Sequence, residues 1–513
     1  MEPAIPTLPT DSAQLQALVS ELYERVSRLE REKTHLESRL QEALRKLFGR
    51  RSEKLNPGQL ELAFEAILDL GVDRPTLEKA EVEVVERRVK VTGKPGGRKP
   101  LPADLPRERV EVPLAADQHA CGKCGAELTR IREEVTAQLD YTPASFKVIE
   151  HVRGVYACKA CEETITRAPR MPQAIEKGLA GPGLLAHVLM SKYGDHLPLY
   201  RQQGIYERHG IELSRSTLAF WVAEAAAVLT PLYAWLREDV VRSRIVQTDD
   251  TPVPVLNPEG GGTHKGRLWV YLGDRDHPHV VFDFTASRER AGPASFLGGF
   301  TGYLQADAYG GYDGIYAGGG VREVACWSHA RRYFYEAAEG SGDRRAYAGL
   351  GFIRQLFGIE REAADSQLDA AARRALRQQR ALPVLAAMRA WLDQQQGEAL
   401  PKSAFGRAVA YVRNQWEALV RYTEDGELSI DNSASERALR AVAVGRKNWI
   451  FAGSDAGGVR AATVYTLIAS AKRHGLEPFA YLRALFEILP THPPDRLAEL
   501  APLHWAARAA APA

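Results

Sequence analysis

Four short segments rich in β-branched and aromatic residues constrain the fold of this chain most. Residues 244–249 (RIVQTD), 267–274 (RLWVYLGD) and 279–287 (HVVFDFTAS) are separated by Gly, Asp and Pro turn signals and have the composition of β-strands. A short helix is expected between Arg288 and Leu297, and residues 301–307 (TGYLQAD) then form a fourth strand. We expect the first three strands to be antiparallel.

Asp249 ends the first of these strands and Asp307 ends the fourth. This order, strand-strand-strand-helix-strand with two acids, is that of a ribonuclease H-like core. If the two strands are neighbours in the sheet, the carboxylates lie side by side and repel each other unless cations neutralise them. A divalent metal, magnesium or manganese, is the natural counterion. Because successive strand residues point to opposite faces, only one of Asp249 and its neighbour Asp250 faces Asp307.

A third acid, Glu436, opens a predicted helix near the C-terminus. Residues 433–436 (SASE) match a capping box, in which Glu436 would only satisfy backbone donors. The alternative is a third metal ligand, because the cations that follow suit a phosphate backbone and no other acid occurs before Asp455. We favour the catalytic role. The proposed phosphate contacts on this helix are Arg440, Arg446 and Lys447.

Two Cys-x-x-Cys pairs have the spacing of a zinc ribbon. The four thiols belong to Cys121, Cys124, Cys158 and Cys161. Four thiolates complete a tetrahedral site, so this zinc would be structural. Disulfides are disfavoured because a cytoplasmic chain keeps its thiols reduced, and a degenerate site without zinc is the other alternative. The fifth cysteine, Cys326, is expected in the core rather than as a nucleophile.

An apolar heptad seam runs along the N-terminal segment. One heptad position is occupied by Leu15, Leu22, Leu29, Leu36 and Ala43, and the other by Val19, Val26, Lys33, Leu40 and Leu47. A seam of this length is typical of a coiled coil, with the polar Lys33 restricting register or partner number. We therefore expect a homodimer or a higher oligomer rather than a helix packed on its own domain.

A helix-turn-helix pattern precedes the first strand. Pro198 stands where a helix would begin, Gly210 where it would end, and Ser214 where a second helix would be capped. The apolar face of this second helix consists of Leu218, Trp221, Val222 and Ala225. Its first residues, which reach base edges in such motifs, are Arg215, Ser216 and Thr217. A plain helical hairpin has the same pattern and is the alternative.

A basic segment rich in Pro and Gly, residues 87–109, is expected to be a linker. Its residues Arg98 and Lys99 would lie along a DNA groove, or the segment is a solvated basic tether; the residues favour neither interpretation. Between Asp307 and Glu436, helical periodicity without strand signals over residues 345–422 predicts an all-α insertion in the core.

These features predict a multidomain α+β chain. The expected segments are a coiled coil (1–56), a helical segment with basic linker (57–109), a zinc ribbon (110–172), a helix-turn-helix region (173–238), the first part of the core (239–344), the helical insertion (345–422), the second part of the core with Glu436 (423–465), and C-terminal helices with a tail (466–513).

The chain resembles the transposases of the insertion sequence 66 family, in the DDE group. The resemblance rests on strings that follow one another in family order over nearly the whole chain: FGRRSEKL (48–55), GGRKPLPADLPRE (96–108), the two cysteine pairs, GDHLPLYRQQGIYERHGIELSRSTLAFWV (194–222), QTDDTPVPVL (247–256), LQADAYGGYD (304–313), ACWSHARRYF (325–334), DNSASERALR (431–440) and GRKNWIFAGSDAGG (445–458). The family usually has Asp-Glu-Thr at the first acid, whereas this chain has Asp249-Asp250-Thr251. Alignment by Thr251 selects Asp249 as the metal ligand and leaves Asp250 to pair with a nearby Arg.

The resemblance implies a metal-dependent enzyme that cleaves DNA strands and transfers them. The substrates of this enzyme would be double-stranded DNA, namely the terminal inverted repeats of the element and target DNA. The resemblance also allows for accessory proteins encoded by the same element. A DNA-binding regulator on an inactive transposase scaffold and a ribonuclease H-like nuclease without strand transfer are the alternatives.

The net charge of +2 does not identify a partner. The longest apolar run, Leu218 to Leu236, contains Glu224 and Pro231, so no membrane span is expected. The N-terminal residues also lack a secretion signal pattern. We expect a cytoplasmic bacterial protein that associates with the nucleoid when bound to DNA.

Overall fold

The computed structural model describes residues 16–26, 146–152, 155–157, 165–167, 170–176, 178–257 and 261–510, with residues 11, 28–29, 32–33 and 36 besides. The four predicted zinc ligands, Cys121, Cys124, Cys158 and Cys161, and the linker residues Arg98 and Lys99 lie outside the described residues. The zinc ribbon and the basic linker therefore remain predictions. A two-stranded antiparallel sheet, β1 (Val155–Ala157) with β2 (Ile165–Arg167), lies in the same region of the sequence.

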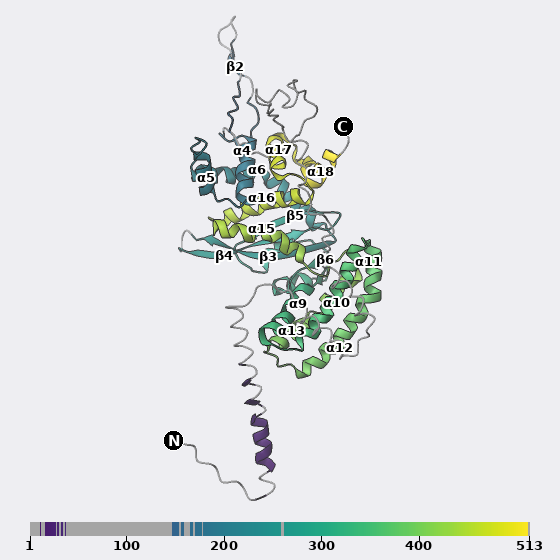
Figure 1. Ribbon diagram of the computed structural model, residues 1–513. Helices are drawn as coiled ribbons and strands as arrows, with labels where there is room; N and C mark the ends of the chain where they lie inside the picture. The colour runs from purple at the N-terminus through teal and green to yellow at the C-terminus, as the bar shows by residue number, and fades with distance from the viewer. Residues whose placement is uncertain are drawn as a thin grey trace, which may run out of the picture. The chain divides into compact units, whose positions relative to one another are not determined.

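A five-stranded mixed sheet forms the centre of the described chain from residue 178 onward (Figure 1). β3 (Ile245–Leu256), β4 (Thr263–Leu272) and β5 (Val280–Thr285) are antiparallel neighbours. After α7 (Ala291–Phe296), β6 (Gly302–Gln305) pairs with β3 in parallel, and β7 (Val321–Val324) pairs with β6 in parallel. The resulting order, β5-β4-β3-β6-β7, confirms the predicted succession of three antiparallel strands, a short helix and a fourth strand.

The boundary predicted for the first strand is wrong, because β3 continues past Asp249 and through Pro252 and Pro254 to Leu256. Proline removes a backbone donor and would normally interrupt a ladder. Beyond Gln247, however, β6 no longer pairs with β3, so the backbone on that side of β3 is not part of a strand ladder. The carbonyls of Pro252 and Pro254 accept from Arg446 and from the Ala452 N–H, which are not part of β4. The prolines thus cost the sheet no hydrogen bond.

Gly302 allows β6 to approach β3 closely. Its φ is +132°, and a Cβ there would lie 2.3 Å from the carbonyl oxygen of Arg244. That same oxygen accepts from the N–H of Tyr303. The ladder ends with the pair Gln247 and Gln305, and Asp249 and Asp307 each follow two residues later in the chain.

Four helical elements precede the sheet, namely α4 (Pro182–Leu189), η2 (Met190–Gly194), α5 (Leu199–Glu207) and α6 (Arg215–Val241). The last two are the pair of helices predicted from the sequence, as a helix-turn-helix or a helical hairpin. α5 follows Pro198, Gly210 has φ +74°, and Ser214 caps α6 by accepting from the N–H of Thr217, so the predicted helix boundaries are confirmed.

α6 is also the one helix among the described residues that is long and apolar enough to span a membrane. Its apolar side chains, including Leu218, Trp221 and Leu229, are instead buried in the core, where α6 packs against α16 (Asp455–Arg473) and β5. This is the packing of a core helix.

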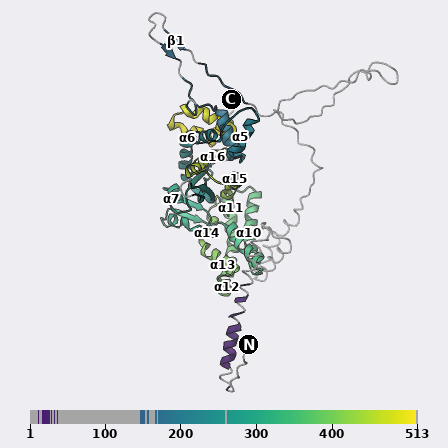
Figure 2. The ribbon, with the colours of Figure 1, turned by 90° about the vertical axis from the view of Figure 1, so that its left-hand side faces the viewer.

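The segment after β7 is helical and has a core of its own. Its elements are α9 (Trp327–Tyr335), η4 (Glu336–Gly340), α10 (Ala346–Asp365), α11 (Ala370–Leu376), η5 (Arg377–Ala381), α12 (Leu382–Glu398), α13 (Ala404–Asn414), α14 (Trp416–Val420) and η6 (Arg421–Glu424). Ahead of β7, between it and β6, lie the short η3 (Gly310–Tyr312) and α8 (Asp313–Tyr316). Phe334, Phe352, Trp391 and Phe405 pack together at the centre of the helical segment. In both views α12 and α13 lie on the side away from α6 and α16 (Figures 1 and 2).

The chain returns to the sheet through α15 (Ser433–Trp449) and α16, followed by α17 (Pro478–Ile488), η7 (Leu489–Thr491), η8 (Pro494–Leu500) and α18 (Pro502–Ala510). α16 packs on β5, where Thr466 and Ser470 accept hydrogen bonds from the N–H groups of Phe282 and Val280. α15 packs on β3.

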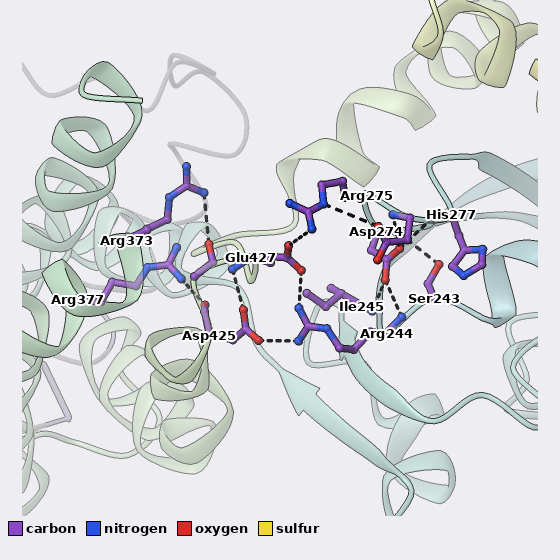
Figure 3. Close-up of polar contacts among 12 residues, drawn as sticks. Ser243, Arg244, Ile245, Asp274, Arg275, His277, Arg373, Arg377, Asp425 and Glu427 are labelled. Atoms are coloured by element: carbon purple, nitrogen blue, oxygen red, sulfur yellow. Dashed lines mark hydrogen bonds and ion pairs between the residues drawn. The ribbon is translucent and has the colours of Figure 1, made fainter. Parts of the chain in front are cut away.

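The segment between η6 and α15 is held by charged residues from both the sheet and the helical insertion (Figure 3). Arg244, at the start of β3, forms ion pairs with Asp425 and Glu427. Arg377 of η5, only 1% exposed, donates to the carbonyls of Tyr422, Asp425 and Leu428. It also forms a two-pronged pair with Glu360 at 2.7 Å.

Replacing Arg377 should destabilise this junction strongly. In Arg377→Lys the shorter, single-point ammonium cannot serve three carbonyls and a carboxylate together, and leaving buried polar groups unpaired costs about 3 kcal/mol or more. Urea unfolding followed by tryptophan fluorescence measures the loss. The control, Arg380→Gln, breaks an exposed pair with Glu362 and should cost less than about 1 kcal/mol. Equal losses for the two variants would contradict this account.

Candidate active site

The three acids predicted as metal ligands come from three separate segments. Asp249 lies within β3, Asp307 lies just beyond the end of β6, and Glu436 lies in the first turn of α15. The parallel pairing of β3 and β6 ends two residues before each of the first two acids, and the charge of Asp307 acts on Asp249. The position of the third depends on how the start of α15 is held.

The start of α15 is held against both β3 and α9. The side chains of Asn432 and Ser435 lie 3.5 Å from the carbonyl oxygen of Thr248, the residue before Asp249. On the other side, the N–H of Trp327 donates to the carbonyl of Ile430 at 3.1 Å, and the Ser328 hydroxyl donates to Asp431 at 2.7 Å. These contacts bring the first turn of α15 to the strand that carries Asp249.

Glu436 does not cap its helix, so the capping-box alternative is wrong. The N-cap of α15 is Asn432, without a side-chain capping bond. Asp431 takes the role instead, because its Oδ1 accepts from both the N–H and the hydroxyl of Ser433. The carboxylate of Glu436 is 3.7 Å from Nε2 of His329 on α9.

The three acids share one electrostatic environment. Burial raises the pKa of Asp249 to about 7, and the negative charges of Asp307, Asp250 and Glu436 raise it further, against the stabilising N–H of Asp250. Burial also raises the pKa of Asp307, and the nearby His329 and Arg288 oppose that rise. A cluster of carboxylates that disfavours its own ionisation attracts a cation.

Asp250 is neutralised within the chain. Its side chain is only 2% exposed and pairs with Arg267 and Arg288, each at 2.8 Å. The expectation that Asp250 pairs with a nearby arginine is therefore confirmed. Arg288 also lies over the ring of Tyr309 and 3.6 Å from Asp307.

The donor types at this site fit magnesium, although the side chains are not gathered around an ion position. Carboxylate oxygens are the ligands that magnesium prefers. Among residues 178–257 and 261–510 and the few described ahead of them, no three Asp, Glu, His or Cys side chains are grouped closely enough to hold a metal ion. Arg288 beside Asp307 and His329 beside Glu436 occupy the neighbourhood of two of the three acids.

Arg288 and His329 were not singled out from the sequence. His329 lies in the string ACWSHARRYF, and Arg288 is the third residue after the end of β5. Arg288 lies in the segment after β5, and His329 lies in the first turn of α9, which follows β7. Functional side chains often collect in the segments that follow strands, and this position is the signal that points to both residues.

The cations predicted on α15 differ from one another. Arg440 and Lys447 are exposed. Arg446 is half-buried and donates to the hydroxyl of Thr251 and the carbonyl of Pro252, so its guanidinium joins α15 to β3. This structural role was not foreseen for Arg446.

At the start of α6, Arg215 and Ser216 are exposed and Thr217 is half-buried. The hydroxyls of Ser216 and Thr217 lie 2.7 and 2.9 Å from the hydroxyl of Ser214 and take part in the helix cap. Arg215 thus presents the exposed charge at this helix start.

Comparison with known protein families agrees with this architecture. The family model described as "Transposase IS66 family" matches residues 177–460, and the "zinc-finger binding domain of transposase IS66" matches residues 118–162. The model described as "Transposase C of IS166 homeodomain" matches residues 35–110, and the "IS66 C-terminal element" matches residues 466–503.

Three curated proteins of Sinorhizobium fredii (strain NBRC 101917 / NGR234) are similar to the chain. Uncharacterized protein y4hP is 33% identical over 93% of this chain and 89% of its own length. Uncharacterized protein y4qI is 33% identical over 96% of this chain and 92% of its own. Uncharacterized protein y4jD is 33% identical over 79% of this chain and 82% of its own.

The first family model covers more than half of the 513 residues, and the relatives extend the similarity over almost the full length. Asp249 in β3, Asp307 after β6 and Glu436 in α15 all lie within the residues that this model matches. The chain belongs to the IS66 family of transposases.

Proposed function

We propose that this chain is a DDE transposase that binds the ends of its element, cleaves DNA there and joins the cleaved strand to target DNA. The observation that carries the proposal is that β3 with Asp249 pairs with β6 shortly before Asp307 and that the start of α15 with Glu436 is held against β3, all within the residues matched by the transposase family model. The strand order β5-β4-β3-β6-β7, with β3 and β6 parallel, supports a ribonuclease H-like assignment for the core.

In this proposal Asp249, Asp307 and Glu436 hold magnesium or manganese. The metal would activate water toward the scissile phosphodiester and stabilise the leaving oxygen. Arg288, held by Asp250 and stacked on Tyr309, keeps a positive charge beside Asp307, and His329 does so beside Glu436 when protonated. The exposed Arg440 and Lys447 on α15 and Arg215 at the start of α6 are the proposed DNA contacts.

The same acids would serve a nuclease without strand transfer. Incubation of purified protein with magnesium, a duplex of the element's end and a target plasmid, followed by mapping of the products, separates the two activities. Joined products support the transposase, and cleaved ends alone support the nuclease. A regulator on an inactive scaffold gives neither product.

Each of Asp249→Asn, Asp307→Asn and Glu436→Gln should abolish cleavage while leaving end binding within about twofold of the wild type, because DNA affinity depends mainly on basic groups elsewhere. Gel mobility shift and denaturing gels measure the two properties. Asp250→Asn should retain cleavage but lower the melting temperature, since it leaves two arginines without their carboxylate. A dead Asp250→Asn together with an active Asp249→Asn would assign the metal to Asp250.

We also propose one structural zinc on Cys121, Cys124, Cys158 and Cys161, supported by the match to the zinc-finger model over residues 118–162. Metal analysis of freshly purified, reduced protein should find about one zinc per chain. Cys121→Ser should lose this zinc, whereas Cys326→Ser, which changes a buried thiol of the core, should keep it. Absence of zinc from the wild-type protein would refute the site.

The N-terminal helix is the proposed oligomerisation element. Residues 16–26 are helical, and its seam residues are exposed, among them Val19 (63%), Leu22 (50%), Val26 (51%) and Leu29 (54%). A row of exposed apolar side chains at heptad spacing favours a partner helix.

Deletion of residues 1–47 should therefore convert the protein to a monomer in sedimentation experiments, because the seam is removed. Cleavage of a pre-nicked end by the truncated protein should persist, since the carboxylates belong to a different part of the chain. Identical sedimentation of the truncated and full chains would argue against the coiled coil.

A further inference from the structure

The turn between α15 and α16 has an unusual backbone. Ile450, directly after α15, has φ +64° and ψ −51°, and the N–H of Phe451 donates to the carbonyl of Trp449 at 2.7 Å. This is a γ-turn with positive φ at its centre, which is rare and strained, and a β-branched residue is among the least suited to it. Strain of this kind persists only where the surrounding structure enforces it, and it clusters at functional sites.

The surrounding structure does enforce it here. Ala452 forms a parallel bridge with Val255, with its N–H donating to Pro254 and its carbonyl accepting from Leu256. On the other side, the N–H of Ile450 closes the last turn of α15 on the carbonyl of Arg446, which is itself bonded to β3. The turn is therefore fixed at both ends to the same strand that carries Asp249.

The fixed turn holds two apolar side chains out in solvent. Ile450 is 65% exposed and Phe451 is 40% exposed. Solvation alone gives no reason to place an isoleucine in a strained, exposed position where glycine would be unstrained. We therefore infer that the backbone of this turn holds the two side chains in solvent for contact with a ligand.

An exposed face of α15 connects this turn with the acids. Arg437, Arg440, Val444 and Lys447 are exposed and follow one another at helical spacing, so they form one stripe along the helix. No acid occurs in the chain between Glu436 and Asp455, and Asp455 is paired with His264 at 2.9 Å. At a rise of 1.5 Å per residue, Glu436 and Ile450 are roughly 20 Å apart along the helix, which is the length of about six base pairs of DNA.

We propose that the Ile450–Phe451 turn is an apolar wedge that unstacks bases of the element's end, about six base pairs from the scissile phosphate, while the α15 stripe follows the DNA backbone. The inference rests on the proposed function and adds to it the part of the substrate that is distorted. Apolar side chains flanked by cations are the means by which proteins enter a base step and kink a duplex. The stripe carries three exposed cations, Arg437, Arg440 and Lys447, and no acid. This positive charge favours the polyanionic DNA backbone as the occupant.

The test uses the full chain, duplexes of the element's end that each carry one 2-aminopurine between positions three and nine from the cleavage point, and buffer without divalent metal. The wild type should raise the fluorescence several-fold near position six. It should also bind more tightly to a duplex mismatched there, because the cost of unstacking is already met.

The double variant Ile450→Gly with Phe451→Ala should lose the fluorescence rise, lose the preference for the mismatch and bind the matched duplex about tenfold more weakly. Its melting temperature should stay unchanged or rise, because glycine relieves the strained turn. A matched control is Gln367→Gly, which replaces another exposed residue with positive φ (51°) in the linker between α10 and α11. This control should behave as the wild type toward DNA.

A fluorescence rise that survives in the double variant overturns the wedge. Altered sedimentation of the double variant without a change in fluorescence also overturns it and assigns the turn to contacts between proteins. If the wild type binds and, with magnesium, cleaves the end without any rise, the wedge fails and the proposed function stands. If the wild type does not bind the end at all, the proposed function fails with it.

Discussion

The parallel pairing of β3 with β6 is the interaction on which the rest of the site depends. The two strands are joined by only three residue pairs, from Ile245 with Tyr303 to Gln247 with Gln305. The close approach at Gly302 fixes where this pairing begins, and Asp249 and Asp307 both follow its last residue pair by two positions. A shift of one residue would turn every side chain of β6 to the opposite face and separate the two acids.

The two neighbouring aspartates of β3, Asp249 and Asp250, have different electrostatic environments. Asp250 is compensated by Arg267 and Arg288 and is nearly inaccessible to solvent. The pKa of Asp249 is instead raised by burial first and then by the charges of Asp307, Asp250 and Glu436. The chain therefore pairs Asp250 with two arginines, whereas among the described residues Asp249 has no ion pair. That contrast is the physical basis for choosing Asp249 as the proposed ligand.

The local features of the chain were predictable from its sequence. The first three strands, the helix after them and the cap at Ser214 follow from residue preferences that act over a few positions. β7 was not predicted, because its four residues, VREV, place two charged side chains in a strand too short to show a pattern. The end of β3 was also missed, since proline ordinarily terminates strands and only the short length of β6 makes it harmless there.

Contacts between distant segments were beyond such local reasoning. A capping box at Ser433 is as good a local solution as the one found, but Asp431, tied to Ser328, takes the N–H of Ser433 first. The same applies to Arg446, whose bonds to Thr251 and Pro252 depend on where β3 lies. Arg288 and His329 became visible as parts of the site only when the acids near them were placed in space.

The way the helical insertion is attached has a consequence for how this catalytic unit accommodates sequence change. The chain leaves the sheet after β7 and comes back beside the same point, where Ala325 bonds to Ala418 and Trp327 bonds to Ile430. Besides these two bonds, Arg377 of η5 pairs with Glu360 of α10 and donates to carbonyls of the segment before α15, so the placement of Glu436 depends on the base of the insertion and on this arginine. The loop between α12 and α13, where Pro401 and Lys402 are exposed, lies outside these contacts. A change of length is therefore tolerated best in that loop, although the loop lies between two of the three proposed ligands in the sequence.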